Sequence, residues 1–425
     1  MKVSASFDNP HSHRAALLTV FLAVLIDLMG FGIVLPLLPF YASVFKASAV
    51  QIGLLYSTYS FAQLIFSPIW GSLSDRYGRR PIMLISTFGA ALAYLLFGLA
   101  HALWLLFLSR LIAGIMGGNI STAQAYVADV TTHEDRAKGM GLIGAAFGIG
   151  FVIGPAIGAL LIHPKFLELF HIGQRNEFAL PGFFAALLSL SSFLLVWFKL
   201  PETVKSQEND NERVVRSSVF SKTFWREIAN EKRKNANGVF PMLLVSIFLL
   251  SFAQASLYSS FPLFCNHHLN LSAGHVGFLF VYMGTIAIII QGGLIRILTK
   301  KFSEERLFLI GSIAMALGFA SIPFATSQNA LIFFLGLMSV GGSLNGPTLN
   351  SLISKEADPA KVGATMGTSQ GIASLGRVIG PTWGGFAYDV WYYLPFLTTA
   401  ALLSVTIPVG LKLTRRLQKS TFLAK

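Results

Sequence analysis

The 425-residue sequence has little cysteine and little charge. Its one cysteine, Cys265, excludes an internal disulfide framework and a thiolate metal site, and we expect it to be a packed thiol in a helix. Charged residues make up 12% of the chain, whereas soluble domains contain about 25%. So few charged residues cannot cover the water-facing surface of a soluble protein of 425 residues. With 54% hydrophobic residues and a mean hydropathy of +0.64, the composition is that of an integral membrane protein.

The sequence also lacks the patterns of a signal peptide and of an enzyme. The first apolar run, 15–41, is too long for a cleavable signal peptide, and it contains an acid and two prolines. His267, His268 and His275 lie at the edge of apolar runs, without the spacing of a metal site. No nucleophile–base pair is visible. We therefore predict no cofactor, no metal and no enzymatic activity.

Apolar runs of about 20 residues, long enough to cross a bilayer as helices, recur along the chain. They lie at 15–41, 49–73, 81–100, 103–127, 138–162, 178–200, 239–265, 273–299, 306–325, 329–353, 362–388 and 391–413. The sequence thus predicts an all-α membrane protein with twelve transmembrane helices. An even number of spans places both termini on one side of the membrane.

Lysine and arginine are concentrated on that same side. They occupy the even-numbered loops and the tail, at Arg76, Arg79, Arg80, Arg136, Lys138, 205–234, Lys300, Lys301, Arg306, Lys355, Lys361 and 412–425. The opposite side has only Lys46, Lys165 and Arg175. Because positive charge marks the cytoplasmic side, both termini are predicted to be cytoplasmic. Orientation also accounts for the net charge of +13, so nucleic acid is not an expected partner.

One polar segment, 201–238, divides the chain into two predicted halves, 1–200 and 239–425. Within it, Phe220, Phe224 and Ile228 recur at helical spacing among basic residues, which indicates an amphipathic helix on the anionic leaflet. A charged linker without structure is the alternative for its first third, where 207–211 is wholly polar.

The two halves share a repeat. Glycines and prolines of the run 138–162 recur 226 residues later, in the run 362–388. The matching pairs are Gly141 and Gly367, Gly150 and Gly376, Gly154 and Gly380, Pro155 and Pro381, and Gly158 and Gly384. The same offset relates Asn119 to Asn345. The chain is therefore read as a duplicated six-helix unit, an architecture in which transporters bind substrate between the repeats.

The loop after the second run reads Gly71-Ser-Leu-Ser-Asp75-Arg76-Tyr-Gly78-Arg79-Arg80. This loop resembles the cytoplasmic signature of the major facilitator superfamily, and the resemblance covers the whole chain. The Arg110-x-x-x-Gly114 pattern and the repeated glycine–proline motif resemble further signatures, typical of its drug:proton antiporter branch. The resemblance implies two six-helix halves that transport a small molecule by alternating access.

Two groups of residues follow from these motifs. Gly71, Asp75, Arg76, Gly78, Arg79, Arg80 and Asp129 are expected to form a cytoplasmic gate. There Asp75 would face the N-terminus of a neighbouring helix near 363–367, and Arg79 would pair with Asp129. Solvated charges that only orient the protein are the alternative. Gly150, Gly154, Pro155, Gly158, Gly376, Gly380, Pro381 and Gly384 are expected to give helix kinks and close helix interfaces.

Asp27 is an acid in the middle of an apolar run, which is costly and points to function. Burial favours the neutral form of a carboxyl group, which suits a residue that binds and releases a proton. Its neighbourhood resembles the tetracycline efflux pumps, in which the matching aspartate is required. The resemblance also associates Arg110 with proton coupling, although an arginine cannot itself carry the proton. A hydrogen-bonded acid that fixes helix packing is the alternative for Asp27.

Polar and aromatic residues within the runs are candidates for a substrate cavity. They are Phe31, Tyr59, Gln63, Asn119, Gln124, Gln254, Tyr258, Asn345, Gln370 and Arg377. Three partners are open for Arg377, namely an anionic substrate, Asp27 and lipid phosphate. Where the tetracycline pumps have a second aspartate this chain has Ala93, and the runs of the second half contain no mid-span acid. Both departures argue against recognition of a metal–tetracycline complex.

The sequence therefore predicts a bacterial inner-membrane antiporter that expels an amphipathic small molecule or drug in exchange for protons. Its expected partners are the substrate, protons and the lipid bilayer, and the expected state is a monomer. A transporter of a specific metabolite (siderophore, sugar or lipid) is one alternative. A non-transporting sensor on the same fold is another.

Overall fold

A computed structural model describes residues 10–131, 136–169, 177–203, 239–356 and 362–423. Helices account for nearly all of these residues, and none of the described residues lies in a strand. The prediction of an all-α protein is confirmed. The predicted amphipathic helix around Phe220–Ile228, with most of the linker 201–238, lies outside the described residues.

The described chain forms two compact units. The first contains 1–46, 58–215 and 273–281, and the second contains 47–57, 216–272 and 282–425. Each unit thus includes a short piece of the other half, the start of a helix in both cases. The boundaries expected from the sequence, 1–200 and 239–425, remain a prediction about the duplicated halves.

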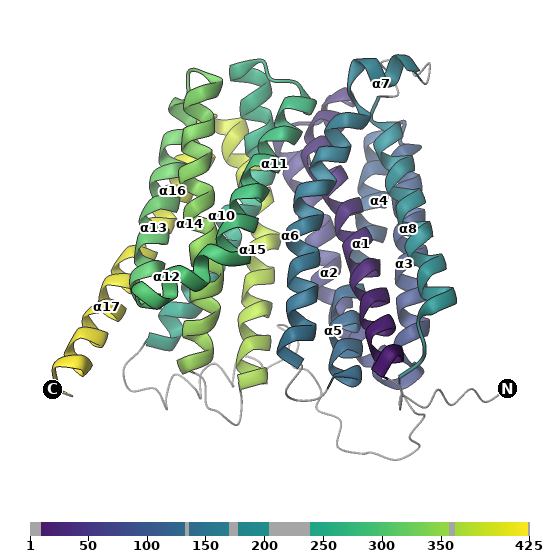
Figure 1. Ribbon diagram of the computed structural model, residues 1–425. Helices are drawn as coiled ribbons and strands as arrows, with labels where there is room; N and C mark the ends of the chain where they lie inside the picture. The colour runs from purple at the N-terminus through teal and green to yellow at the C-terminus, as the bar shows by residue number, and fades with distance from the viewer. Residues whose placement is uncertain (1–9, 132–135, 170–176, 204–238, 357–361, 424–425) are drawn as a thin grey trace. The chain divides into compact units, whose positions relative to one another are not determined.

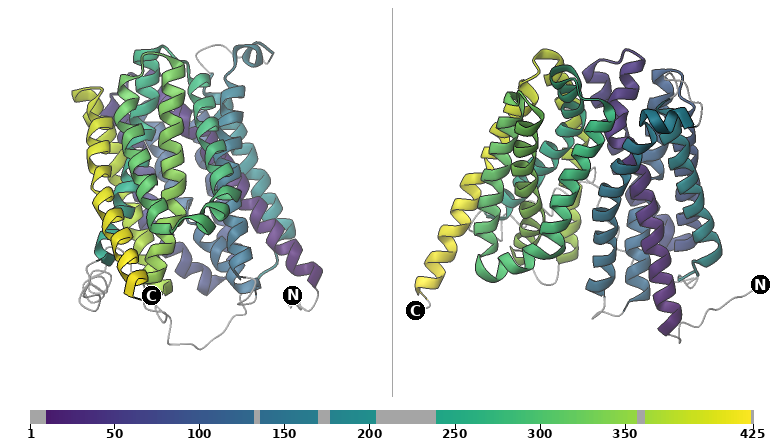
Figure 2. Two further views of the ribbon diagram at one scale, coloured as in Figure 1. Left: turned by 60° about the vertical axis from the view of Figure 1, so that its left-hand side comes forward. Right: turned by 45° about the horizontal axis from the view of Figure 1, so that its top comes forward.

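Apart from the short α7, which lies across one end, the helices of the first unit run side by side along a common direction (Figures 1 and 2). They are α1 (Pro10–Val44), most of α2 (Ala49–Tyr77), α3 (Arg79–Gly98), α4 (Leu103–Met116), α5 (Asn119–Val130), α6 (Arg136–Leu161), the short α7 (Pro164–Leu169) and α8 (Ala179–Lys199). Within the unit α1 packs against α6 and α8, and α3 packs against α4 and α8.

The second unit repeats this plan. It contains α10 (Val239–Leu269), most of α11 (Ala273–Ile289), the π-helical turn η2 (Ile290–Leu294), α12 (Ile295–Lys301), α13 (Glu304–Ser321), the 3₁₀ turn η3 (Ile322–Phe324), α14 (Gln328–Glu356), α15 (Val362–Val390), α16 (Leu394–Ser404) and α17 (Thr406–Leu423). Here α10 packs against α15, and α13 packs against α14. The pair α10–α15 therefore corresponds to the pair α1–α6.

Ten helices of the described residues are long and apolar enough to cross a membrane. The two other predicted spans form α2 and α15, which have 29 residues each and are less apolar. At 1.5 Å per residue each is roughly 44 Å long, more than the ~30 Å hydrocarbon core. Their lengths agree with twelve spans, which stays the prediction.

Three predicted runs are interrupted. The run 103–127 is split by Gly117 and Gly118 into α4 and α5, the run 273–299 contains the π-helical turn, and the run 391–413 breaks near Val405. Hydropathy does not reveal these breaks, because an apolar run keeps its composition where its hydrogen-bond pattern changes. The break after α4 matters for the site, since it places Asn119 at the start of a helix.

The glycine motifs give close helix contacts in both units. A Cβ atom added to Gly154 of α6 would lie 2.7 Å from the Met29 carbonyl oxygen of α1. One added to Gly380 of α15 would lie 2.6 Å from the Phe252 carbonyl oxygen of α10. Such distances leave no room for a side chain. The motif thus packs each helix onto the first helix of its own half, and its expected place at the interface of the halves stays a prediction.

Candidate functional site

Asp27 and Asn119 form the centre of a polar cluster in the first unit. The Asn119 amide nitrogen donates a hydrogen bond of 3.0 Å to Asp27 Oδ2. The other carboxyl oxygen, Asp27 Oδ1, is buried without a hydrogen-bond partner, and so is the Asn119 Oδ1 atom. Two buried acceptors therefore lack a donor. A proton on Asp27 would supply one, so the geometry suits a carboxyl group that takes up a proton.

Arg110 lies in α4, buried to 3% exposure among aromatic rings. Its guanidinium carbon is 5.2 Å from the ring centre of Phe97 and 5.8 Å from that of Tyr94, within cation–π range. Tyr94 also reaches α1, because a Cβ atom on Gly30 would lie 3.0 Å from its ring. Tyr94 thus lies between Arg110 and α1, the helix that contains Asp27.

The sequence did not single out Tyr94. A tyrosine in an apolar run has no signal of its own, since its ring fits any helix packing. The one available hint is its place beside Ala93, where the resembling pumps have a second acid. The structure places a buried phenol next to that position, and Tyr94 is 5% exposed.

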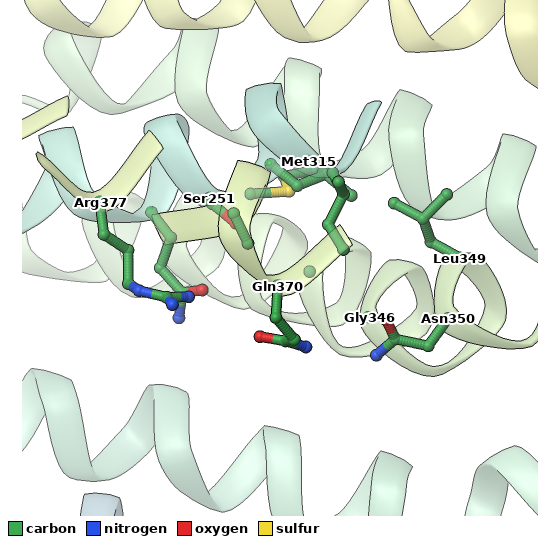
Figure 3. Close-up of a pocket in the computed structure, with 12 residues that line it drawn as sticks. Ser251, Met315, Gly346, Leu349, Asn350, Gln370 and Arg377 are labelled. Atoms are coloured by element: carbon green, nitrogen blue, oxygen red, sulfur yellow. The ribbon is translucent and has the colours of Figure 1, made fainter. Parts of the chain in front are cut away.

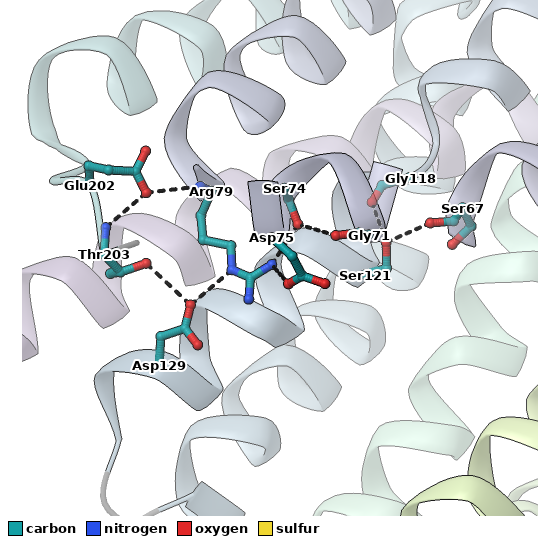
Figure 4. A network of polar contacts seen from close by, with 10 residues as sticks. All are labelled: Ser67, Gly71, Ser74, Asp75, Arg79, Gly118, Ser121, Asp129, Glu202 and Thr203. Atoms are coloured by element: carbon teal, nitrogen blue, oxygen red, sulfur yellow. Dashed lines mark hydrogen bonds and ion pairs between the residues drawn. The ribbon is translucent and has the colours of Figure 1, made fainter. Parts of the chain in front are cut away.

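Arg79 organises a second cluster, at the turn between α2 and α3 (Figure 4). Its Nε atom lies 2.9 Å from Asp129 Oδ2, and its Nη1 atom pairs with Asp75 and donates to Ser74 Oγ at 2.7 Å. The expected pair of Arg79 with Asp129 is therefore present. We call these residues, with Glu202 and Thr203, the turn network.

Glu202, like Ser74 and Thr203, is a member that was not among the predicted gate residues. Its carboxylate accepts hydrogen bonds from the backbone amides of Arg79, at 2.9 Å, and Arg80, at 3.2 Å. These are the first amides of α3, which have no partners inside the helix. Gly78 precedes them with φ of +103°, a conformation that favours glycine. A side chain on Gly78 would also meet Glu202, since a Cβ atom there would lie 2.4 Å from the carboxylate.

The remaining predicted gate residues lie around this network. Gly71 accepts a hydrogen bond of 2.8 Å from Ser74 Oγ, and Arg80 donates to the Trp197 carbonyl at 2.6 Å. Arg76 is exposed and lies 5.3 Å from the ring centre of Tyr77. The expected approach of Asp75 to the start of α15 involves both units and stays a prediction.

Several predicted cavity residues of the first unit surround the break between α4 and α5. Gln63 donates to the Gly117 carbonyl at 3.2 Å and to the Tyr59 hydroxyl at 3.4 Å. Phe31 packs on Tyr59, with ring centres 5.2 Å apart. These three residues lie together beside the Asp27 cluster. Gln124 is exposed on α5 and takes no part in these contacts.

In the second unit, Gln254, Gln370 and Arg377 line one cavity (Figure 3). Tyr258 and Asn345 are not among its lining residues. Tyr258 instead packs near Tyr56, with ring centres 6.4 Å apart, and Asn345 is completely buried. Some of the predicted cavity residues therefore lie in a cluster of the first unit, others line a cavity of the second, and Gln124, Tyr258 and Asn345 belong to neither.

The chain matches known proteins along most of its length. The sequence profile of the Major Facilitator Superfamily matches residues 20–381 and 243–422. The class B tetracycline resistance protein of Escherichia coli is 31% identical over 400 residues, 90% of this chain and 93% of that protein. Multidrug resistance protein 2 of Bacillus subtilis is 27% identical over 385 residues, 89% of this chain and 91% of that protein.

A solved structure has the same fold. A bacterial homologue of the human lysosomal transporter Spinster superposes with a TM-score of 0.75 at 14% identity, covering 96% of this chain and 98% of that one. The superposition and the family match together confirm the predicted all-α transporter fold, and the number of twelve spans stays a prediction.

Proposed function

Because the chain belongs to the Major Facilitator Superfamily, it is a multi-pass membrane transporter, and we propose that it exports an amphipathic small molecule in exchange for protons. The tetracycline and multidrug resistance proteins that it resembles favour a drug-like substrate. The lysine and arginine distribution favours a bacterial inner membrane protein with both termini in the cytoplasm.

The Asp27–Asn119 cluster carries the proposal for proton coupling. Among the described residues, Asp27 is the acid that lies far from any helix end, near the middle of α1. Its Oδ1 atom and that of Asn119 are buried acceptors without donors. Protonation of Asp27 removes a buried charge and supplies a donor. Deprotonation reverses both changes, so the proton on Asp27 alters the stability of this helix contact.

Arg110 and Tyr94 adjust this equilibrium. The Arg110 cation stabilises a negative charge nearby, and Tyr94 lies between it and the helix of Asp27. The arginine cannot exchange the proton itself. We assign it the role of lowering the free energy of the ionised form of Asp27 at the step in which the proton leaves.

The turn network supports the gate. Arg79 holds Asp75 of α2 and Asp129 of α5, while Glu202 holds the start of α3. Three helix ends are thus tied by charged groups at one end of the first unit. We propose that this rigid end is the part of the cytoplasmic gate that the first half contributes.

Reconstituted vesicles with a trapped pH indicator test the coupling. Addition of a transported compound should release protons from the compartment that it enters, and a panel of amphipathic compounds would find such a substrate. Asp27→Asn keeps the size and the hydrogen bonds of the side chain but does not titrate. We expect it to abolish substrate-driven proton flux and uphill transport, while substrate binding to the purified protein remains.

The matched control is Glu168→Gln, the same chemical change at an exposed acid of α7. It should leave proton flux unchanged. Uphill transport by Asp27→Asn near the wild-type rate would make Asp27 a structural residue and remove the proposed mechanism. Absence of substrate-driven proton flux from the wild-type protein across the whole panel would favour a sensor instead.

A further inference from the structure

The cavity of the second unit lies between α10, α13, α14 and α15. Its volume is about 180 Å³, and its lining comprises Ile247, Leu250, Ser251, Gln254, Met315, Gly342, Gly346, Leu349, Asn350, Gln370, Ala373 and Arg377. In Figure 3 the polar ends of Arg377, Gln370 and Asn350 lie toward one side of the view, whereas Met315 and Leu349 lie toward the other. The cavity is therefore amphipathic, with most of the labelled polar groups on one side and Ser251 beside Met315.

Arg377 is the one lining residue with a formal charge, and none of the twelve is acidic. It lies near the middle of α15, where a charged side chain is costly unless it faces a cavity or a partner. Its Nη2 atom donates to Ser374 Oγ at 2.7 Å, a contact within α15 that fixes the direction of the guanidinium. The lining thus presents to the cavity a positive charge whose direction is fixed by Ser374.

The neutral polar groups of the lining add directional contacts. The amide of Gln370 can donate hydrogen bonds to an anion, whereas the Gln254 side chain is hydrogen-bonded to Tyr258. Asn350 also lies in the lining, but its Oδ1 atom is buried. Arg377 and the neighbouring amide groups fit a ligand whose charged end accepts several hydrogen bonds.

The size of the cavity limits what enters. Pockets that hold a whole drug-sized molecule measure about 300–1,000 Å³, and this one is about 180 Å³. It has room for one charged group with a small apolar part. The rest of a larger amphipathic molecule would lie outside it.

We propose that this cavity is the subsite for the negatively charged end of the transported molecule, with Arg377 as its counter-charge. A carboxylate, sulfonate or phosphate fits, because the arginine fork offers paired N–H donors to such groups. The inference rests on the proposed transport function and adds the substrate class, an amphipathic anion. The same chemistry is found in soluble organic anions and in the headgroups of anionic lipids.

Equilibrium binding of two matched fluorescent probes tests the subsite. Dansylglycine has a carboxylate, whereas dansylamide has the same fluorophore and no charge. Both are titrated onto the purified full-length protein in nanodiscs of phosphatidylcholine. We expect the wild-type protein to bind the anionic probe on the order of 10-fold more tightly or better, as for a hydrogen bond to a charged group. Arg377→Gln should lose this preference, and Arg377→Lys should keep part of it.

Arg296→Gln is the control, because it removes a positive charge from α12, outside the lining of the cavity. It should bind both probes like the wild type. Equal binding of the two probes to the wild type, or an unchanged preference in Arg377→Gln, would overturn the subsite. Arg377→Lys serves as the folded variant if Arg377→Gln does not purify as a monodisperse protein.

Two further measurements identify the source of the bound anion and distinguish the subsite proposal from the proton-coupling proposal. Displacement of dansylglycine by phosphatidylglycerol in the nanodiscs would identify a lipid headgroup as the bound anion, and absence of displacement would identify a soluble anion. Asp27→Asn should keep the probe preference, because binding requires no proton gradient. Loss of transport in Asp27→Asn together with an unchanged preference in Arg377→Gln would refute the subsite alone.

Discussion

The glycine motif of α6 permits a stability experiment with its control in the same helix. A Cβ atom on Gly154 would lie 2.7 Å from the Met29 carbonyl oxygen and 2.8 Å from the Gly32 Cα atom, both backbone atoms of α1. A Cβ atom on Gly141, the first glycine of the same motif, would have nothing within 4 Å. Alanine at these two positions therefore adds the same methyl group to a tight helix contact and to open space.

The difference between the two variants isolates the steric effect. Replacing glycine by alanine within a helix is favourable by up to about 1 kcal/mol, and this gain is common to both variants. Overpacking at Gly154 costs about 1–3 kcal/mol, because backbone cannot move aside as a flexible side chain can. We expect Gly154→Ala to be less stable than Gly141→Ala by about 1–3 kcal/mol.

The second half provides an independent repeat of the measurement. A Cβ atom added to Gly380 would lie 2.6 Å from the Phe252 carbonyl oxygen, and one added to Gly367 would have nothing within 4 Å. The apparent free energy of unfolding is measured for all four variants by denaturation in mixed detergent micelles. Equal stability of Gly154→Ala and Gly141→Ala, or of Gly380→Ala and Gly367→Ala, would refute the claim that the motif packs α6 on α1 and α15 on α10.

Two other predictions concern residues that the structure added to the site. Tyr94→Phe keeps the ring beside Arg110 but removes the hydroxyl. We therefore expect substrate-driven proton flux to fall about 10-fold or more, while substrate affinity is kept. An unchanged flux would mean that Tyr94 serves only in helix packing. Glu202→Ala removes the acceptor of the Arg79 and Arg80 amides, so the apparent free energy of unfolding should fall by roughly 1–2 kcal/mol. Thermal denaturation measures this change, and a melting temperature equal to that of the wild type would contradict it.

Apolar length was enough to predict the helices, because a bilayer requires one long apolar run for each span. The expected run 49–73 begins where α2 begins, and 239–265 begins where α10 begins. The helices then extend past the apolar runs, as in α2, which continues through the charged residues up to Tyr77. Helix geometry does not stop at the edge of the hydrocarbon, so composition places these ends too early.

The site was predictable where a single residue was out of place in its surroundings. Asp27 could be found as an acid in an apolar run, yet its partner Asn119 is 92 residues away in the sequence. Nothing local indicates that pair. Glu202 looked like an ordinary linker acid, because the sequence does not show that the first amides of α3 lie beside it. A single polar residue in an apolar run can be recognised from the sequence, whereas contacts between helices can be recognised only from the structure.

The repeat shows how the two halves have diverged. Asn119 and Asn345 occupy equivalent positions, 226 residues apart. The position equivalent to Asp27 is the completely buried Ala253. Asn345 therefore has no acid at the position that corresponds to the partner of Asn119. The position equivalent to Arg377 is Phe151, whose ring packs 5.8 Å from that of Phe31. Asp27 and Arg377 thus each have an apolar counterpart in the other half.

This division has an energetic consequence for the proposed exchange. If Asp27 carries one proton inward, and one monovalent anion that binds at Arg377 is released outside, each cycle moves two positive charges toward the cytoplasm. Moving one elementary charge across a membrane potential of 100 mV is worth about 2.3 kcal/mol, so two are worth about 4.6 kcal/mol. A cation exported by the same proton would move no net charge. The anionic subsite therefore lets the membrane potential drive export, in addition to the pH gradient.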